Sequence, residues 1–230
     1  HSLHGMHTAV IWLLWNHRLM RLMLKISDYT NPFDAVTDFE NALSDYTGAP
    51  YVVTTDCCTH AIELCFRYNQ YTNVELNTIT IPSRTYLSVP MTFHKLNIPY
   101  TLIDQDWKNE YNFGFTNIWD SARLLSNGMY KRGQMQCVSF GRTKPLDIGR
   151  GGAILLDDKN AYDAIKQMSY DGRDLSISPW AEQHTFKVGY HYMMRPEECV
   201  EGLNKLNNNE ISIGHEFSYP DLSTISIGNE

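Results

Sequence analysis

Apolar residues recur along this chain at two spacings, one typical of helices and the other of strands. In residues 31–48 they recur every three or four positions, and the segment closes on Gly48, the residue type preferred just after a helix. We therefore expect a helix that ends there. The β-branched run at residues 51–54 predicts a strand, and helical spacing returns at residues 59–71.

The same alternation of strand and helix continues along the chain. Further strands are predicted at residues 76–81, 100–103, around 118, 135–140 and 153–156. Further helices are predicted at residues 86–96, 161–168 and 197–206. This order is typical of an α/β fold with a mostly parallel sheet flanked by helices. Because no repeat or linker interrupts it, we expect residues 26–230 to form one domain.

The first 25 residues contain an apolar run that is too short to cross a bilayer. Residues 8–15 fall well below the roughly 20 apolar residues that a membrane-spanning helix needs. Basic residues follow this run instead of preceding it, which is the reverse of a secretory signal. We expect an amphipathic helix at residues 8–25, within an N-terminal extension of residues 1–25. Alternatively, these residues lie upstream of a natural start at Met23 and pack loosely.

Charge and cysteine content narrow the function classes. The net charge of −7 and the pI near 5.7 disfavour nucleic-acid binding, which needs clustered Lys and Arg. The five cysteines are odd in number and include no C-x-x-C pair, so we predict neither a disulfide framework nor a metal site. A cytoplasmic protein without a membrane partner fits this composition.

Polar residues follow most of the predicted strands, and the carboxyl ends of parallel strands are where ligands bind in α/β sheets. These polar segments are residues 57–59, 82–86, 120–123, 139–144 and 149–152. Together they meet the needs of pyridoxal 5′-phosphate. Thr59 and Ser139 offer hydroxyls to its phosphate, Tyr86 a ring face, Asp120 a carboxylate to the ring nitrogen, and Lys144 an amine that forms a Schiff base with the aldehyde. Once released, that amine is a candidate general base.

Each of these residues also has a plain structural interpretation. A lysine in a loop is usually a solvated charge, and Asp120 could simply cap a helix. Tyr86 could be a core residue, because aromatic side chains bury large areas. Thr59 can cap a helix and bind phosphate at once. Cysteines at positions 57 and 58 could be reactive thiolates, although small buried side chains in a turn are the simpler account.

Seven short motifs, in order and spacing, resemble the DegT-type sugar aminotransferases, which are pyridoxal-phosphate enzymes of fold type I. The resemblance runs from about residue 34 to 206, and its most specific part is the Ser-Phe-x-x-x-Lys segment with a Gly-Gly pair behind it. The motifs are residues 39–48 (FENALSDYTG), 59–62 (THAI), 82–86 (PSRTY), 119–122 (WDSA), 139–146 (SFGRTKPL), 149–152 (GRGG) and 189–192 (GYHY).

The resemblance implies a fold-type-I transferase large domain and a reaction. Glutamate, or a similar amino-acid donor, would supply an amino group to a nucleotide-linked keto sugar. A lysine at position 144 separates such transferases from related dehydratases, which carry histidine there. The family pattern assigns the cofactor to Lys144, Asp120, Tyr86, Thr59 and Ser139, as above. It also implies a homodimer with shared active sites, in which His191 reaches the neighbouring subunit's phosphate. Alternatively, His191 is packed among the adjacent tyrosines.

Several positions depart from the family pattern. Cys57 and Cys58 replace a Ser-Gly pair, which would reshape the phosphate turn around Cys58. Arg123 replaces Gln or His, Arg150 an acidic residue, and Met193 an arginine. Arg123, Arg150 and Arg173 are candidate substrate residues. Family members usually continue into a small C-terminal domain, which we expect to be absent or vestigial here.

Two other functions stay open. The chain could be a catalytically impaired binding or scaffold protein that partners a full-length aminotransferase. It could also run another fold-type-I reaction, such as cysteine desulfuration or amino-acid transamination. That reaction would need an arginine for the substrate carboxylate, for which Arg150, Arg173 and Arg195 are candidates.

Overall fold

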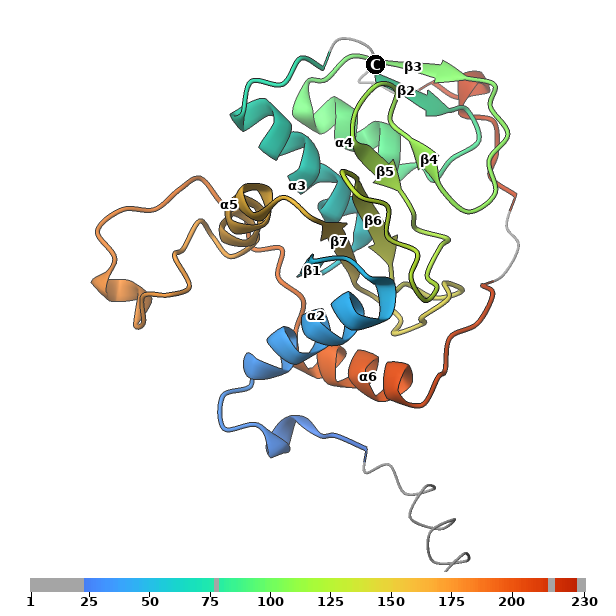
Figure 1. The fold of residues 1–230 in the computed structure, drawn as a ribbon. Helices are drawn as coiled ribbons and strands as arrows, with labels where there is room; N and C mark the ends of the chain where they lie inside the picture. Colours follow the sequence, from blue (N-terminus) through green and yellow to red (C-terminus); the bar gives the residue numbers. More distant parts are fainter. Residues whose placement is uncertain (1–22, 77–78, 215–217, 227–230) are drawn as a thin grey trace, which may run out of the picture.

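The computed structural model describes residues 23–76, 79–214 and 218–226 (Figure 1). Its helices are α2 (Asp34–Thr47), α3 (Cys58–Tyr71), α4 (Ser88–Leu96), α5 (Lys159–Ser169) and α6 (Pro196–Asn207), with 3-10 turns η1 (Ile26–Asp28), η2 (Trp180–Glu182) and η3 (Leu222–Thr224). Its strands are β1 (Tyr51–Thr55), β2 (Ile79–Pro82), β3 (Tyr100–Ile103), β4 (Tyr111–Asn112), β5 (Ile118–Asp120), β6 (Met135–Ser139) and β7 (Gly152–Leu156).

The predicted helices and strands are confirmed at nearly all of their positions. Helix α2 ends as expected, with Gly48 in the left-handed region at φ 80°. Helix α4 begins at Ser88, two residues later than predicted, and β4 is a strand that the sequence pattern does not predict. Of the amphipathic helix expected at residues 8–25, residues 8–22 lie outside the described part of the chain, and residues 23–25 are not helical.

The α/β class is confirmed, but the sheet is mixed, so the prediction of a mostly parallel sheet is wrong in strand direction. The order in the five-stranded sheet is β1-β7-β6-β5-β4, in which only β5 and β6 pair in parallel. Strands β2 and β3 form a separate parallel pair. The cause is the connection between β6 and β7, which contains no helix and therefore returns the chain antiparallel to the strand it has left.

The strand directions still bring the predicted site segments to one edge. Strands β1, β5 and β6 run in the same direction, because β7 is antiparallel to both β1 and β6, and β5 is parallel to β6. The register places Thr55 and Ser139, the last residues of β1 and β6, on either side of Gly152, the first residue of β7. The carboxyl ends of three strands and the start of β7 therefore meet.

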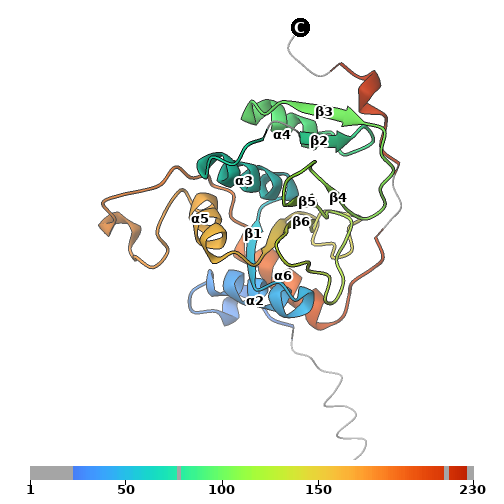
Figure 2. The ribbon, with the colours of Figure 1, turned by 45° about the horizontal axis from the view of Figure 1, so that its top comes forward.

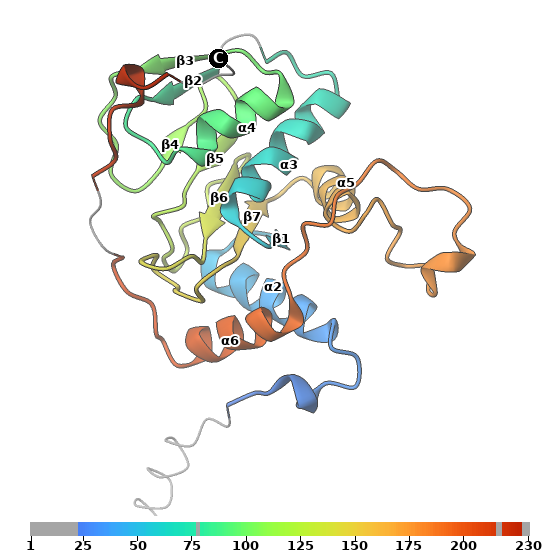
Figure 3. The same cartoon turned by 180° about the vertical axis from the view of Figure 1, so that it is seen from behind.

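Helices cover both faces of the sheet (Figures 1 and 3). Helices α3, α4 and α5 form one apolar core with the sheet, and α2 and α6 form a second core on the other face. Successive strand residues point alternately into the two cores. Val53 and Ile154 pack in the first core, and Val52 and Leu155 pack in the second. The β2–β3 pair and α4 lie together at the end of the molecule away from α2 and α6 (Figure 2).

Residues 171–189, here called the arm, leave the body after α5 and return before α6 (Figures 1 and 3). Its base is closed by a 3.0 Å hydrogen bond from the backbone N–H of Asp171 to the carbonyl of Tyr190. The arm carries exposed apolar side chains at Leu175, Ile177, Trp180, Phe186 and Val188. Across residues 23–76, 79–214 and 218–226, helices long and apolar enough to cross a membrane are absent.

Candidate active site

The turn from β1 into α3 presents unpaired backbone N–H groups. Cys57 stands before the helix with extended backbone, and the first bond of the helix runs from the N–H of Ala61 to the carbonyl of Cys57. The N–H groups of the first turn therefore lack helical acceptors, and no side chain in the described part of the chain caps this end. Such a helix start attracts anions through its N–H groups and its dipole.

A cavity of about 390 Å³ opens beside this helix start, in the size range of small-molecule sites. Eight of the ten predicted site residues line it, and His191 and Arg173 do not. The eight are Cys58, Thr59, Tyr86, Asp120, Arg123, Ser139, Lys144 and Arg150. They come from the ends of β1, β5 and β6, from the segment before α4, and from the glycine-rich segment before β7. The amine and the carboxylate that the sequence pattern singles out thus share one cavity.

Lys144 lies in the loop between β6 and β7. Its backbone N–H bonds the carbonyl of Gly141 at 3.2 Å, which closes the turn that carries the side chain. Burial is the largest influence on the pKa of Lys144 and lowers it. Arg123 lowers it further, whereas the Cys58 thiol and the Asp120 carboxylate partly oppose the shift. A larger fraction of this amine is therefore neutral than for a solvated lysine.

Asp120 ends β5, and its side chain is 5% exposed. Its Oδ1 accepts a 2.9 Å hydrogen bond from the N–H of Ala122, and its Oδ2 accepts one of 2.9 Å from the hydroxyl of Tyr111. Burial raises the pKa of Asp120, and these two donors and the charge of Lys144 act in the opposite direction. The carboxylate is thus fixed on two sides while it lines the cavity.

Tyr111 and Ser88 are among the residues at the site that sequence reasoning missed. Tyr111 lies in the two-residue strand β4, directly opposite Asp120 in the antiparallel ladder. So short a strand has no detectable alternation, and the signal that was available is the Tyr-x-Phe pair at residues 111–113. The second residue is Ser88, whose hydroxyl lies 2.8 Å from the Thr59 hydroxyl.

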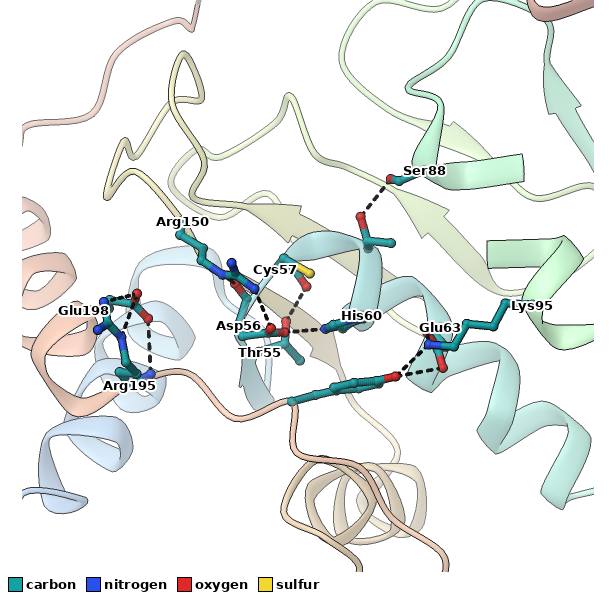
Figure 4. A network of polar contacts seen from close by, with 12 residues as sticks. Thr55, Asp56, Cys57, His60, Glu63, Ser88, Lys95, Arg150, Arg195 and Glu198 are labelled. Carbon is teal, nitrogen blue, oxygen red and sulfur yellow. Dashed lines mark hydrogen bonds and ion pairs between the residues drawn. The ribbon is translucent and has the colours of Figure 1, made fainter. Parts of the chain in front are cut away.

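The predicted phosphate hydroxyls flank the helix start. Thr59 lies in the first turn of α3, and its hydroxyl and that of Ser88 join α3 to α4 at the cavity wall (Figure 4). Ser139 ends β6, and its Oγ accepts a 3.3 Å hydrogen bond from the N–H of Gly141. Tyr86 is 61% exposed and lines the same cavity, so the plain interpretation of Tyr86 as a core residue is wrong.

A network of charges holds the turn before α3 (Figure 4). The Asp56 carboxylate bonds Nδ1 of His60 at 2.6 Å and the Arg150 guanidinium at 2.8 Å. Burial alone would lower the pKa of His60, but the hydrogen bonds to Asp56 and Cys57 raise it to about 9. Asp56, Cys57 and His60 have metal-ligand atoms within 4.8 Å of one another, yet both Asp56 oxygens are already engaged by His60 and Arg150.

The network also ties the segment before α6 to α3. The ring of Tyr192 stacks on that of His60, with centroids 3.6 Å apart and planes 8° apart. Lys95 donates to the Tyr192 hydroxyl at 2.8 Å, and that hydroxyl donates to Glu63 at 3.2 Å. Because Arg150 forms an ion pair with Asp56, it belongs to this network as well as to the cavity wall.

The remaining candidates lie elsewhere. His191 is exposed and pairs with Asp171 at 3.2 Å, at the base of the arm. Arg173 pairs with the same carboxylate at 2.7 Å. Arg195 pairs with Glu198 at 2.8 Å, at the start of α6. Within one subunit, none of these three described side chains lines the cavity.

Two further hollows adjoin the cavity, and Arg123 lines all three. The ring of Trp107 stacks on that of Tyr219, with centroids 5.9 Å apart and planes 18° apart, between the cavity and the second hollow. Lys108 lines the second and third hollows. The cavity and its two adjoining hollows therefore combine two basic side chains, Arg123 and Lys108, with a pair of stacked aromatic rings.

Comparison with protein-family models gives one match, which spans residues 17–114 and 127–215 and is described as the DegT/DnrJ/EryC1/StrS aminotransferase family. This chain belongs to that family. The match covers most of the chain and contains eight of the ten residues predicted for the site. The other two, Asp120 and Arg123, lie in the interval between the two matched segments. The family membership confirms the resemblance drawn from the seven motifs.

Solved structures share this family fold at low sequence identity. AtS13 from Actinomadura melliaura has a TM-score of 0.64 and 18% identity, over 76% of this chain and 60% of that one. The sugar aminotransferase CalS13 from Micromonospora echinospora has a TM-score of 0.64 and 14% identity, over 76% and 61%. The NtdA protein from Bacillus subtilis, solved with bound cofactor PMP, has a TM-score of 0.60 and 15% identity, over 75% and 47%.

The chain thus spans about 60% of the length of the first two structures and less of the third. Comparison with curated proteins gives no match. These structures establish the fold of the DegT-family chain, an α/β transferase fold with a mixed sheet flanked by helices.

Proposed function

We propose that this DegT-family chain is an aminotransferase that binds pyridoxal 5′-phosphate and moves an amino group from glutamate, or a similar donor, to a nucleotide-linked keto sugar. The observation that carries the proposal is the single cavity lined by both the Lys144 amine and the Asp120 carboxylate. Family membership supports the transferase class, and the PMP bound to the Bacillus subtilis protein supports the cofactor.

The polar groups around the cavity fit the parts of this cofactor. Its phosphate would lie at the start of α3, against the Thr59 and Ser139 hydroxyls. Asp120 would face the ring nitrogen, Tyr86 the ring, and Lys144 the aldehyde carbon. When bound, the cofactor supplies a carbonyl that takes up the amino group and a ring that accepts electrons from the substrate carbon.

Lys144 is the proposed base. Because burial lowers its pKa, its amine could accept the proton from the substrate carbon and, in a 1,3 shift, deliver it to the carbon of the cofactor's former aldehyde. Asp120 lines the same cavity, and its ionised carboxylate would stabilise a protonated ring nitrogen of the cofactor. Lys144 would thus take up and release a proton, whereas Asp120 would keep its negative charge. The surroundings of each residue set its pKa for that task.

The basic side chains in the cavity and its adjoining hollows support the proposal of an anionic substrate. Arg123 lines the cavity and both adjoining hollows, and Lys108 lines the two hollows. A diphosphate could pair with these cations, and a nucleotide base could lie against Trp107 and Tyr219. Among the arginines predicted for substrate, Arg123 has the best-supported position, since it lines the cavity and both adjoining hollows.

The arm supports the proposed homodimer. Its exposed apolar side chains, Trp180 and Phe186 among them, form the kind of surface that marks a protein contact. The arm ends beside His191, which does not line the cavity of its own subunit. A second copy that packs on the arm would allow His191 to reach the partner's phosphate.

We also infer a reducing compartment such as the cytoplasm. All five cysteines of the chain are free thiols, and four of them are buried. The thiols of Cys65 and Cys137 share a hydrogen bond, with their Sγ atoms 3.7 Å apart, and form no disulfide. This arrangement is typical of proteins that keep their thiols reduced.

The proposed function is tested on the first half of the reaction, in which the donor passes its amino group to the cofactor. Protein loaded with pyridoxal phosphate and freed of excess cofactor is mixed with glutamate, and the 2-oxoglutarate released is measured per subunit. We expect about one equivalent from the wild type, as in double-displacement kinetics, and none from Lys144→Ala. Lys159→Ala is the matched control, because that lysine is exposed and paired with Asp163.

A wild type that binds the cofactor but releases no 2-oxoglutarate, with glutamate or with other amino donors, would favour the scaffold alternative. If the first half succeeds, nucleotide-linked keto sugars are added to the loaded protein. Return of the cofactor to its starting absorbance identifies the acceptor, and return with none of the sugars but with 2-oxo acids would indicate amino-acid transamination instead.

A further inference from the structure

Tyr111 and Asp120 face each other across the β4–β5 ladder. They are directly opposed in the antiparallel register, so their side chains project on the same face of the sheet. The Tyr111 hydroxyl donates a 2.9 Å hydrogen bond to Oδ2 of Asp120. Both residues are almost fully buried, at 1% and 5% exposure. A buried hydrogen bond to a carboxylate is among the stronger polar contacts in a protein.

Thr85 extends this contact into a chain of three groups. Its hydroxyl lies 2.7 Å from that of Tyr111, and its residue is 1% exposed. The tyrosine hydroxyl has only one proton, and an ionised Asp120 takes it as acceptor. The Thr85 hydroxyl must then donate to the Tyr111 oxygen, so both hydroxyl protons point along the chain towards the carboxylate.

The contacts leave Asp120 free to accept a further bond from the cavity. Its Oδ1 has one donor, the N–H of Ala122, and its Oδ2 has one, the Tyr111 hydroxyl. Each carboxylate oxygen can accept two hydrogen bonds. The other titratable groups that interact electrostatically with Asp120 come from α3, β6, the β6–β7 loop and the C-terminal segment. They are Cys58, Cys137, Lys144 and Tyr219. Of these, Lys144 lowers the pKa of Asp120, and the Asp120 charge raises the pKa of the others.

We propose that Tyr111, supported by Thr85, is a positioning residue that keeps the Asp120 carboxylate ionised and directed into the cavity. The inference rests on the proposed function in one respect, since the charge would serve the cofactor's ring nitrogen. The effect of Tyr111 on the Asp120 carboxylate depends only on residues of this chain. Tyr111 suits the task because burial raises its pKa well above the ordinary value, so it stays a donor at every working pH.

The direction of the effect follows from the hydrogen bond. The Tyr111 hydroxyl stabilises the charged form of Asp120 against a burial that favours the neutral form. Removing the hydroxyl therefore raises the pKa of Asp120. Tyr111→Phe keeps the ring, which packs edge-on against Phe113 at 5.3 Å and Trp107 at 4.9 Å, so the variant preserves the core.

The experiment titrates Asp120 in the protein without cofactor. Carboxyl carbons are labelled with carbon-13 aspartate, and the Asp120 signal is identified by its loss in Asp120→Asn. In Tyr111→Phe we expect the titration midpoint to rise by about one pH unit, a tenfold change in proton affinity. Thr85→Val should raise it by a smaller amount, and Thr85→Ser, which keeps the hydroxyl, should restore the wild-type midpoint.

Tyr130→Phe is the matched control. Its half-buried hydroxyl donates to the carbonyl of Gln134, and Tyr130 is not among the residues that line the cavity. That variant should leave the Asp120 midpoint unchanged. Should Tyr111→Phe fail to fold, Thr85→Val and Thr85→Ser give the same test through the second hydroxyl of the chain.

A second measurement links the inference to the cofactor. The dissociation constant of pyridoxal phosphate should rise several-fold in Tyr111→Phe and remain unchanged in Tyr130→Phe. If the wild type binds no pyridoxal phosphate, the proposed function fails while the titration still decides the role of Tyr111. An Asp120 midpoint that stays in place or falls in both Tyr111→Phe and Thr85→Val overturns the inference.

Discussion

A Cβ atom on Gly152 would lie 2.5 Å from the backbone nitrogen of Cys58. Real Cβ atoms do not approach backbone so closely, so the start of α3 can rest against the first residue of β7 only because position 152 has no side chain. This contact fixes the distance between the helix start and the edge of the sheet. It gives the second glycine of the Gly-Gly motif a packing role beside the cavity.

Gly152→Ala should therefore destabilise the protein. The expected loss is about 1–3 kcal/mol, the usual range for overpacking a tight site, because backbone on both sides must shift. Urea unfolding measures it. Gly141→Ala is the matched control, since its added Cβ would meet only Ser139 Oγ at 3.5 Å, an ordinary contact distance. Equal stability of the two variants would contradict the close approach.

The His60–Asp56 pair predicts a pH dependence of stability. Although burial opposes it, the hydrogen bonds to Asp56 and Cys57 raise the pKa of His60 from the ordinary 6.5, expected in the unfolded chain, to about 9 in the folded protein, so the folded state holds a proton more tightly. The stabilisation is complete below pH 6.5 and is lost as the pH rises through about 9. His60→Gln removes it.

The measurement is the free energy of unfolding of wild type and His60→Gln between pH 6 and 10, taken as a difference so that other titrating groups cancel. The wild-type advantage should shrink steadily as the pH rises across this window. His184→Gln, on the exposed arm, is the control for replacing a histidine outside this pair. A His60→Gln difference that grows with pH would show that the sign is wrong.

The elements follow from the sequence because each buries a continuous apolar face. Alternation at Val52 and Val53 places one residue in each core, and the spacing of Phe39 and Leu43 places both on the buried face of α2. Strand direction does not follow from such patterns. The loop between β6 and β7 contains no helix, and only that connection shows that β7 turns back.

The sequence likewise predicts some residues of the site and not others. Lys144, Asp120, Thr59 and Ser139 were found because polar residues after strands collect at one edge. Tyr111 was not found, because its role depends on the residue opposite it across a two-residue strand. The ion pair of Arg150 with Asp56 was also missed, because it joins residues that are 94 positions apart.

Thr59→Val should weaken cofactor binding. A hydroxyl that bonds a charged phosphate contributes roughly 1.5 kcal/mol, so the dissociation constant of pyridoxal phosphate should rise about tenfold. Equilibrium dialysis or fluorescence titration measures it. Thr72→Val, just beyond the other end of α3, removes a hydroxyl that bonds the Tyr68 carbonyl and should bind normally. Equal affinity of the two variants would remove Thr59 from the phosphate site.

The arm should hold two copies together. Replacing Trp180 and Phe186 by serine removes two exposed aromatic side chains without disturbing either core, so the fold should persist while the dimer weakens. Sedimentation velocity over a concentration series detects the shift towards monomer. Serine at Phe115, which is 92% exposed and lies outside the arm, is the control. A wild type that stays monomeric at every concentration would contradict the proposed dimer.

The most direct test of the account is to locate the covalent bond to the cofactor. Wild-type protein is incubated with pyridoxal phosphate, reduced with borohydride, digested and analysed by mass spectrometry. The account predicts the cofactor's added mass on the peptide that contains Lys144, and its loss in Lys144→Ala. Cofactor mass on another lysine of the wild type, or on none while the cofactor remains bound, would contradict it.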